Sequence, residues 1–259
     1  MRVAVLGLGE AGSIYAADLA ARGADVAGVD PRVEAGLPGV RQVPGIAEAV
    51  EGADVVLSLV GGAASADALR DALPALTAAT VFADMNTSHP DTKRALAAAA
   101  GARGIPFADV AILAPVARQR IGTDLLLSGP AAPRLRAVLD GFGVPTADAG
   151  PEPGAAAGRK LLRSVFMKGL AALVLESATA AEAVGAREWV MGQIAAEFGE
   201  DGPELLERLL DGTRRHAVRR EAEMRDVRAH LKSLGAAHPM TDGTIAWLHT
   251  IAAAPPPAR

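Results

Sequence analysis

The first 23 residues, MRVAVLGLGEAGSIYAADLAARG (Met1–Gly23), decide the fold. The apolar run Arg2–Leu8 predicts a buried strand, and the stretch from Glu10 predicts a helix that ends at Gly23. Gly7, Gly9 and Gly12 stand where strand gives way to helix, although each glycine costs a helix about 1 kcal/mol relative to alanine. In a strand–turn–helix unit this spacing gives a tight turn, backbone access for a pyrophosphate and close helix–strand packing. We therefore predict a dinucleotide-binding turn with the phosphates at the helix N-terminus.

An acidic residue ends the next predicted strand, DVAGVD (Asp25–Asp30). In such folds a carboxylate at this place holds the ribose hydroxyls of the adenosine. Asp30 favours NAD because its charge would repel the 2′-phosphate of NADP, whereas Arg32 is placed to pair with that phosphate. The sequence leaves NAD and NADP open, with NAD slightly favoured. The predicted cofactor-binding residues are Gly7, Gly9, Glu10, Ala11, Gly12, Asp30, Arg32, Val60, Asn86 and Thr87.

The rest of the first 150 residues alternates apolar strands with helices. Further strands are expected at 54–60, 80–86, 106–113 and 123–129. This alternation predicts an α/β fold, a Rossmann-type doubly wound parallel sheet. GPEPGAAAG (Gly150–Gly158) marks a boundary, and only helices are expected beyond it, beginning with a long one around 159–184. We predict a dinucleotide-binding domain over residues 1–150, then an all-helical substrate and dimerisation domain over residues 151–259, with a frayed end at AAAPPPAR (252–259).

Composition narrows the classes of function. The chain has 259 residues, a net charge of −4 and no cysteine, which excludes disulfides, cysteine nucleophiles and zinc–thiolate sites. The basic run RRHAVRR (Arg214–Arg220) is followed by Glu221 and Glu223, so no nucleic-acid partner is expected. Five scattered histidines predict no metal site. The sequence has neither a signal peptide nor an apolar run long enough to span a bilayer, so we expect a cytoplasmic protein without a membrane partner.

Two further motifs carry a resemblance to a known family. DMNTSHP (Asp84–Pro90) closes the strand predicted at 80–86, and GAAAGRKLLRS (Gly154–Ser164) opens the long helix. Together with the glycine turn, they make the chain resemble the β-hydroxyacid dehydrogenases, which include 3-hydroxyisobutyrate and 6-phosphogluconate dehydrogenases. The resemblance covers nearly the whole chain, with a shorter carboxy-terminal part. It implies an NAD(P)-dependent oxidoreductase that acts on a hydroxyacid-like or carbonyl substrate and often completes its cleft with a partner subunit.

The resemblance also implies roles for single residues. The family's catalytic lysine, six residues after a glycine, corresponds to Lys160, and a glutamate sixteen residues further on corresponds to Glu176. The family's D-x-S-T-x-x-P segment lies near the nicotinamide, so Asn86 and Thr87 are expected to contact cofactor and substrate. Lys160 would be the general acid–base group, because burial favours its neutral form and a substrate oxyanion its charged form. Lys168 is expected to be structural.

Two departures from the family concern the substrate. The family loop D-A-P-V-S-G-G, which holds the substrate carboxylate, is DVAILAP here (Asp109–Pro115), so Leu113, Ala114 and Pro115 replace Ser-Gly-Gly. Ser164, with Arg163 before it, stands where the family has a substrate-orienting asparagine. The chain is therefore a divergent branch. Its predicted substrate-binding residues are Asn86, Thr87, Leu113, Arg163 and Ser164, with His216, Arg219, Arg220, Glu223 and His238 as a further pool.

Two other functions stay open on the sequence alone. Imine reductases are similar in architecture and lack the lysine, so Lys160 counts against them and the altered loop counts for them. The other is a dinucleotide-binding protein without catalysis, against which Lys160 and the Asn86–Thr87 pair both count. We also expect a homodimer, because the short, Leu/Ala-rich helical part would bury apolar surface against a second copy.

Overall fold

The computed structural model describes residues 1–34 and 36–253, so most of the expected frayed end lies outside the described residues. The chain forms two compact units, Met1–Lys160 and Leu161–Arg259. The sequence placed the boundary earlier, after residue 150. The division comes later because the beginning of helix α7 (Ala155–Ala183) belongs to the first unit, where Ala156 packs in one cluster with Ala111 and Ala149.

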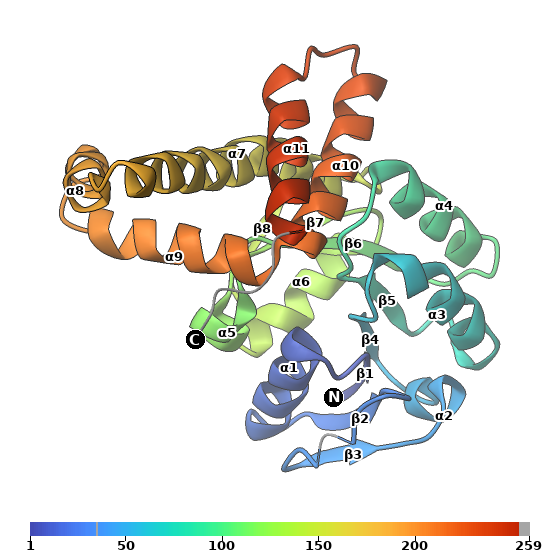
Figure 1. Cartoon of the computed structure of the whole chain (residues 1–259). Coiled ribbons are helices and arrows are strands. Elements are labelled where there is room, and N and C mark those ends of the chain that lie inside the picture. Colours follow the sequence, from blue (N-terminus) through green and yellow to red (C-terminus); the bar gives the residue numbers. More distant parts are fainter. Residues whose placement is uncertain (35, 254–259) are drawn as a thin grey trace. The chain divides into compact units, whose positions relative to one another are not determined.

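The amino-terminal unit is built on one eight-stranded sheet in the order β3-β2-β1-β4-β5-β6-β7-β8 (Figure 1). All neighbouring strands are parallel except β6 and β7, which run antiparallel with Asp109 opposite Ser128. This order reverses direction between β1 and β4, as in Rossmann-type folds, and confirms the predicted α/β class. The strands are β1 (Arg2–Leu6), β2 (Asp25–Val29), β3 (Val40–Gln42), β4 (Val55–Ser58), β5 (Val81–Asp84), β6 (Phe107–Ile112), β7 (Leu125–Ser128) and β8 (Thr146–Asp148).

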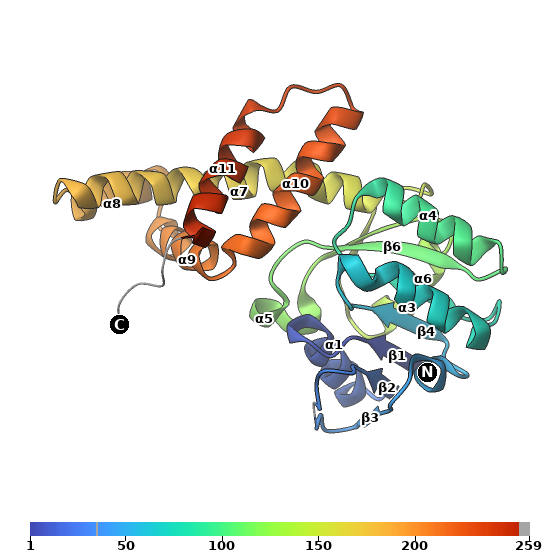
Figure 2. The same cartoon turned by 45° about the vertical axis from the view of Figure 1, so that its right-hand side comes forward.

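Helices cover both faces of this sheet (Figures 1 and 2). Helices α1 (Glu10–Ala21) and α6 (Ala132–Gly141) share one apolar cluster with the strands. Helices α2 (Ile46–Val50), α3 (Ser65–Ala72) and α4 (Pro90–Gly101) share another. In β1, Val3 and Val5 belong to the first cluster, and Ala4 and Leu6 to the second. Successive side chains point to opposite faces, so burial on both faces explains the continuous apolar strands.

The sequence missed the short elements at the edges and in the loops. Strands β3 and β8 are the outer strands of the sheet, each three residues long and without a buried residue. Their sequences, VRQ and TAD, lack the apolar run that marks a buried strand. The short helix α5 (Val116–Gln119) and the 3₁₀ turns Gly62–Ala64 and Arg120–Gly122 were also missed, because three or four residues are too few to show a helical pattern.

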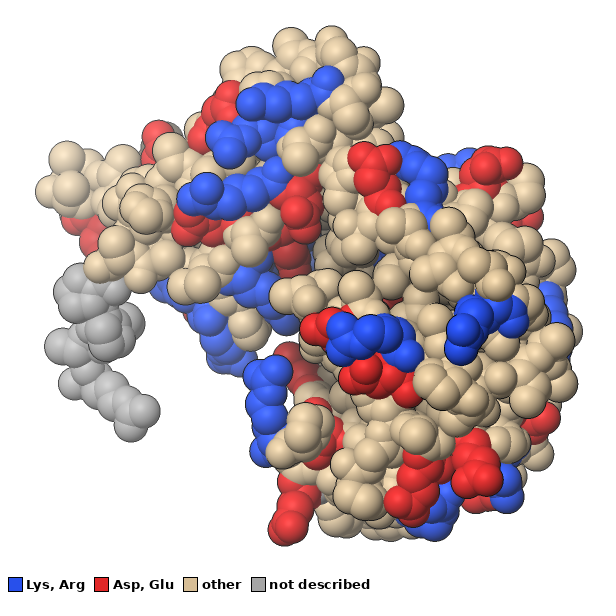
Figure 3. All heavy atoms as spheres, turned by 90° about the vertical axis from the view of Figure 1, so that its right-hand side faces the viewer, with Lys and Arg blue, Asp and Glu red and all other residues tan. Residues whose placement is uncertain are grey.

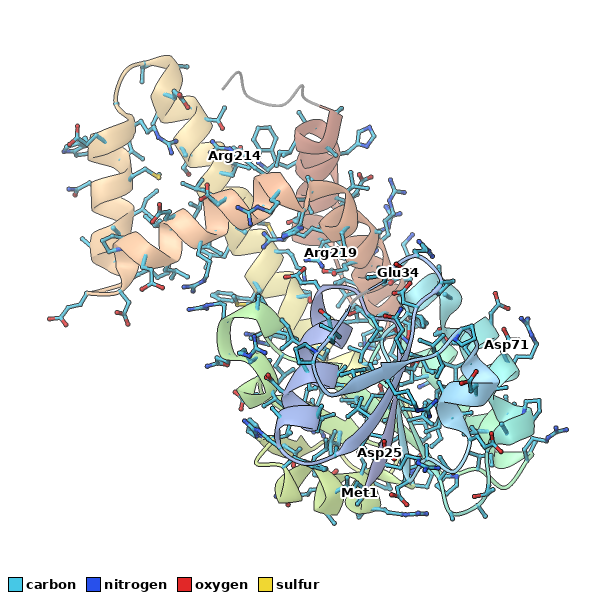
Figure 4. All side chains as sticks on the ribbon, turned by 90° about the horizontal axis from the view of Figure 1, so that it is seen from below. Met1, Asp25, Glu34, Asp71, Arg214 and Arg219 are labelled. Atoms are coloured by element: carbon cyan, nitrogen blue, oxygen red, sulfur yellow. The ribbon has the colours of Figure 1, made fainter. Side chains whose placement is uncertain are left out.

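The carboxy-terminal unit is helical throughout its described residues, 161–253, as predicted. Helix α7 continues into it and is followed by α8 (Arg187–Glu197), α9 (Gly202–Arg215), α10 (Ala217–Ser233) and α11 (Pro239–Ala253). Figure 4 labels Arg214 on α9 and Arg219 on α10. Helices α9 and α10 meet at His216. Two apolar clusters hold the unit together, one centred on α7 and α9, the other on α10 and α11.

Two surface properties bear on function. Among the described helices, none combines the length and the apolar character needed to cross a bilayer. On the face of the amino-terminal unit visible in Figure 3, acidic and basic side chains are interspersed, and neither sign forms an extended patch.

Candidate active site

The predicted cofactor residues gather at one end of the sheet. In Figure 4, Met1 and Asp25 mark the amino ends of β1 and β2, and Glu34 lies beyond the carboxyl end of β2. Doubly wound sheets bind ligands outside the carboxyl ends of their strands, where the strand order reverses. Here that place is formed by the glycine turn after β1 and the loops after β4 and β5.

The glycine turn has the shape that a dinucleotide pyrophosphate requires. Gly7 has φ +89°, and a Cβ there would lie 2.6 Å from the carbonyl oxygen of Leu59. A Cβ on Gly12 would lie 1.9 Å from the carbonyl oxygen of Gly7. Gly9 differs, because it is exposed and nothing lies within 4 Å of an added Cβ. No side chain caps helix α1 at Gly9, so its first N–H groups, in the turn with Glu10 and Ala11, remain available to an anion.

Asp30 is anchored beside this turn. Its Oδ2 accepts a hydrogen bond from the N–H of Leu8 at 2.9 Å, and its Oδ1 accepts one from the N–H of Arg32 at 2.9 Å. A carboxylate has about four lone-pair sites, so each oxygen retains acceptor capacity for a ribose hydroxyl. Asp30 is half-buried and the side chain of Arg32 is exposed. The carboxylate therefore both supports the turn and faces the place where an adenosine ribose binds in such folds.

Asn86 joins the loops that follow β4 and β5. Its Oδ1 accepts from the N–H of Gly61 at 2.7 Å, and its Nδ2 donates to Ser58 Oγ at 3.1 Å and to the Asp84 carboxylate. Both amide hydrogens are therefore used within the protein. The loops also touch directly, because a Cβ on Gly62 would lie 2.5 Å from the carbonyl oxygen of Thr87. Asn86 therefore holds the two loops together, including the loop with half-buried Val60. Its amide hydrogens are not available to a ligand.

Lys160 and Thr87 meet in a small hollow of the same unit. Lys160 Nζ donates a hydrogen bond to Thr87 Oγ1 at 2.8 Å, and both side chains are half-buried. Ser88, which the sequence reasoning missed, also lines the hollow, and its buried hydroxyl has no hydrogen-bond partner among the described residues. The hollow is lined by Asn86, Thr87, Ser88, Val110, Ala111, Ala157 and Lys160. The structure therefore brings together three of the predicted site residues beside a buried hydroxyl.

The sheet fixes the beginning of helix α7, which carries Lys160. Asp109 Oδ2 in β6 accepts from the N–H groups of Gly154 at 3.2 Å and Ala157 at 3.1 Å. Ser128 Oγ in β7 accepts from the N–H of Ala156 at 3.0 Å and donates to Asp109 Oδ2 at 3.0 Å. A carboxylate at a helix N-terminus satisfies free N–H groups and complements the helix dipole. The sequence contained a signal for this role, a buried aspartate within the apolar run FADVAI.

Leu113 leads into a segment that is fastened to helix α1. Its N–H donates to the carbonyl oxygen of Asp124 at 3.0 Å, and its side chain packs in the cluster with Ala111 and Ala156. Further along, Arg120 Nε and the N–H of Ile121 each donate to Asp18 at 3.1 Å. Desolvation would raise the pKa of Asp18, but the bonds from Arg120 and Ile121 outweigh it and hold the pKa below its usual value. Leu113 therefore offers apolar contact and no side-chain donor.

The remaining predicted residues belong to the carboxy-terminal unit. Arg163 is exposed, whereas Ser164 is buried and its Oγ accepts from Lys168 Nζ at 3.0 Å. Lys168 also pairs with Glu223 at 3.0 Å, and Glu176 is exposed. Of the further pool, burial lowers the pKa of Arg220, which donates to Thr213 Oγ1. Among the described residues, no three His, Asp or Glu side chains stand together as metal ligands.

Comparisons with known proteins identify the family of the chain. The family model for the NAD-binding domain of 6-phosphogluconate dehydrogenase matches residues 2–146. A model for a domain of unknown function matches residues 181–251. The 3-hydroxyisobutyrate dehydrogenase of Pseudomonas aeruginosa is 32% identical over 152 residues, which are 54% of this chain and 51% of that protein. The chain thus matches about half the length of this curated relative.

Solved structures extend the similarity over nearly the whole chain. A conserved hypothetical protein from Sinorhizobium meliloti 1021 is 32% identical with a TM-score of 0.74, over 98% of this chain and 88% of its own. The 3-hydroxyisobutyrate dehydrogenase of Mycobacterium tuberculosis (22% identity, TM-score 0.81, 97% and 94% covered) shares the fold. An imine reductase from Streptomyces aurantiacus (20% identity, TM-score 0.62, 96% and 94% covered) shares it less closely. As its motifs predicted, the chain belongs to the β-hydroxyacid dehydrogenase family, and its amino-terminal unit is a nicotinamide-dinucleotide-binding domain.

Proposed function

We propose that the protein is an NAD(P)-dependent oxidoreductase that converts between a hydroxyacid-like alcohol and its carbonyl compound, with Lys160 as general acid–base group. The observation that carries the proposal is the hydrogen bond of Lys160 Nζ to Thr87 Oγ1, in a hollow at the end of a dinucleotide-binding sheet. Family membership supports the same reaction class.

The proton transfer follows from these two side chains. When bound, the nicotinamide accepts a hydride from the substrate carbon in oxidation and returns one in reduction. In oxidation, neutral Lys160 takes the proton of the substrate hydroxyl as the carbon–oxygen double bond forms. In reduction, charged Lys160 gives a proton to the carbonyl oxygen. The Thr87 hydroxyl holds the lysine amine in place.

For the cofactor we propose NAD ahead of NADP. Gly9 is open for the pyrophosphate, and the Asp30 carboxylate is held beside the turn with acceptor capacity to spare. Its charge would bind the ribose hydroxyls of NAD and repel the 2′-phosphate of NADP. Arg32, exposed on the same loop, is the residue that would reverse the preference.

We propose that the substrate is bound without the loop contacts that hold the substrate carboxylate in other members of the family. Leu113 packs against alanines and has no side-chain donor. A substrate with an apolar group beside its hydroxyl or carbonyl fits this edge better than a small free hydroxyacid does. Arg163 and Ser164 remain proposed substrate contacts from the carboxy-terminal unit.

The same apolar edge favours a second candidate, imine reduction. An imine substrate needs no site for a carboxylate, and an imine reductase shares the fold. In this reading Lys160 would be dispensable.

Purified protein with NADH or NADPH, incubated with a panel of carbonyl compounds, hydroxyacids and cyclic imines, tests the proposal. Turnover of carbonyls or hydroxyacids supports it, and turnover of imines alone favours the second candidate. Dinucleotide binding without turnover of any compound would contradict both and leave a non-catalytic binding protein.

We also propose that the protein is a homodimer. On helix α7, Leu162, Phe166 and Leu173 are 44%, 66% and 58% exposed. Intervals of four and seven residues place them on one face of a helix, and a monomer rarely leaves such a stripe uncovered. A second copy of the same helix is the simplest complementary surface.

A further inference from the structure

Three charged side chains form a cluster inside the amino-terminal unit that the proposed chemistry does not use. Lys93 in helix α4 lies between Asp84 at the end of β5 and Asp109 in β6, and all three side chains are 0% exposed. Lys93 Nζ lies 2.7 Å from Asp84 Oδ2 and 3.1 Å from Asp109 Oδ1, and donates to the carbonyl oxygen of Asp84 at 2.8 Å. The contact with the Asp84 carbonyl is a hydrogen bond, and the two carboxylate contacts are ion pairs. Because the side chain of Lys93 is closed off from solvent, it is not placed to contact a substrate or cofactor.

Each aspartate connects Lys93 to a different wall of the hollow. The Asp84 carboxylate accepts a hydrogen bond from Asn86 Nδ2, and Asn86 Oδ1 accepts one from the N–H of Gly61. These bonds fix the position of the loop that carries Thr87, the residue after Asn86. Asp109 accepts hydrogen bonds from the N–H groups of Gly154 and Ala157. These bonds fix the position of the beginning of α7, the helix that carries Lys160.

The first turns of helices α4 and α7 also touch at this point. Gly154 has φ +92°, and a Cβ there would lie 2.7 Å from the carbonyl oxygen of Pro90. Pro90 begins α4, and Lys93 lies one turn further along the same helix. A shift at Lys93 would therefore move the two partners of the Lys160–Thr87 hydrogen bond relative to each other.

We propose that Lys93 is a positioning residue for this site: by pairing with Asp84 and Asp109 it fixes the loop of Thr87 against the first turn of α7 and keeps the Lys160 amine on the Thr87 hydroxyl. The proposal rests on the role proposed for Lys160. The buried lysine supplies no proton and touches no ligand. It determines where the acid–base group stands.

The test measures the amine of Lys160 directly. The whole protein is labelled with acetic anhydride as a function of pH, and modification is read at each lysine by peptide mass spectrometry, with exposed Lys232 as internal reference. Thr87→Val removes the Thr87 hydroxyl as an acceptor and gives the labelling rate of Lys160 without that bond. Lys93→Met should raise the labelling rate of Lys160 relative to Lys232 about fivefold, which corresponds to about 1 kcal/mol, or one hydrogen bond.

Two further variants separate positioning from simple stability. Lys93→Met leaves two carboxylates without their cation and is strongly destabilising, so Asp109→Asn is the second variant. There Lys93 keeps Asp84, and the amide oxygen can still accept from α7, but the neutral amide no longer forms an ion pair with Lys93. Leu135→Ala, at a buried residue of helix α6, is the matched control because it opens a cavity in the same unit but removes no charge and no hydrogen bond.

The expected result is faster labelling and an altered pH profile at Lys160 in Asp109→Asn and in folded Lys93→Met, with no change in Leu135→Ala. A wild-type profile in Asp109→Asn, or the same increase in Leu135→Ala, would overturn the proposal. Labelling needs neither substrate nor cofactor. If Lys160 proves dispensable for turnover, the proposed function fails while this linkage still stands or falls on its own measurement.

Discussion

Lys160 Nζ donates to Thr87 Oγ1 over 2.8 Å although 73 residues separate them in the chain. Thr87 follows β5 and Lys160 lies near the start of α7. Asp109 and Ser128 hold the start of that helix from the antiparallel pair β6–β7. The sheet therefore brings the two side chains together. It places an amine beside a hydroxyl at the end where dinucleotide-binding sheets bind their ligands.

The first prediction concerns this amine. Lys160→Met keeps the length of the side chain but removes the proton carrier, so kcat should fall by about 10²–10⁴-fold. Dinucleotide affinity, measured by fluorescence titration, should be nearly unchanged, because the glycine turn and Asp30 are untouched. Near-full turnover of a carbonyl substrate by this variant would refute the acid–base role and favour imine reduction.

Lys168→Met is the matched control for that variant. Lys168 lies on the same helix, but its amine is engaged by Ser164 and Glu223 in the carboxy-terminal unit. We expect a much smaller loss of kcat. If both variants lose activity equally, the effect belongs to helix α7 as a whole and not to one proton carrier.

A second prediction tests the placement of the pyrophosphate. Gly9→Val adds a branched side chain at a residue with φ −66°, where nothing lies within 4 Å, so the fold should tolerate it. The new methyl groups would occupy the surface that the phosphates approach. Dinucleotide affinity should fall more than tenfold, a loss above about 1.4 kcal/mol, with thermal unfolding close to wild type. Unchanged affinity would mean that the cofactor does not lie on this turn.

A third prediction distinguishes NAD from NADP. Asp30→Asn preserves an oxygen for the N–H of Leu8 and removes the charge, whereas alanine would also loosen the turn. NAD should bind about tenfold more weakly, because a hydrogen bond to a charged group contributes roughly 1.5–3 kcal/mol, and NADP should lose less or gain. Arg32→Ala should weaken NADP alone. The opposite pattern would show that Arg32 dominates and that NADP is the cofactor.

Patterns local in the chain predicted the fold well. The glycine turn, the apolar strands and the Gly-to-Lys160 spacing can each be recognised in a short segment, whereas the antiparallel pairing of β6 with β7 does not follow from the βαβ repeat. The edge strands β3 and β8 escaped because three polar or half-buried residues leave no hydrophobic signature.

The supports of the site were harder to predict because they join distant segments. Lys93 looks like an ordinary helix lysine until its neighbours Leu96 and Ala100 are seen to be buried on the same face. Asn86 was predicted as a ligand contact, but only the structure reveals that Ser58, Asp84 and Gly61 use its amide. Hydrogen-bond saturation depends on three-dimensional partners, which no spacing in one segment encodes.

A fourth prediction tests the homodimer. Phe166→Glu places a charge in the middle of the exposed stripe of α7 and should dissociate the dimer at micromolar concentration, as measured by light scattering. Val218→Glu is the control, because Val218 is 71% exposed on helix α10 and outside that stripe. A wild-type protein that scatters as a monomer would contradict the proposal, as would a Phe166→Glu variant that remains a dimer.

The last prediction concerns acid stability and follows from the contact that fastens the loop of Leu113 to helix α1. Bonds from Arg120 and Ile121 outweigh desolvation and lower the pKa of Asp18 in the folded state. A lowered folded-state pKa means that the contribution of Asp18 to stability is present above its unfolded pKa of about 3.9 and is lost as the pH falls through the folded value. Asp18→Asn should therefore unfold at lower urea concentration than wild type near neutral pH, and the difference should shrink in acid. Added salt should reduce it in part, because Arg120 is 57% exposed and screened while the Ile121 N–H is not. A urea midpoint difference that stays constant from neutral pH into acid would show that the carboxylate charge of Asp18 plays no part in holding the loop.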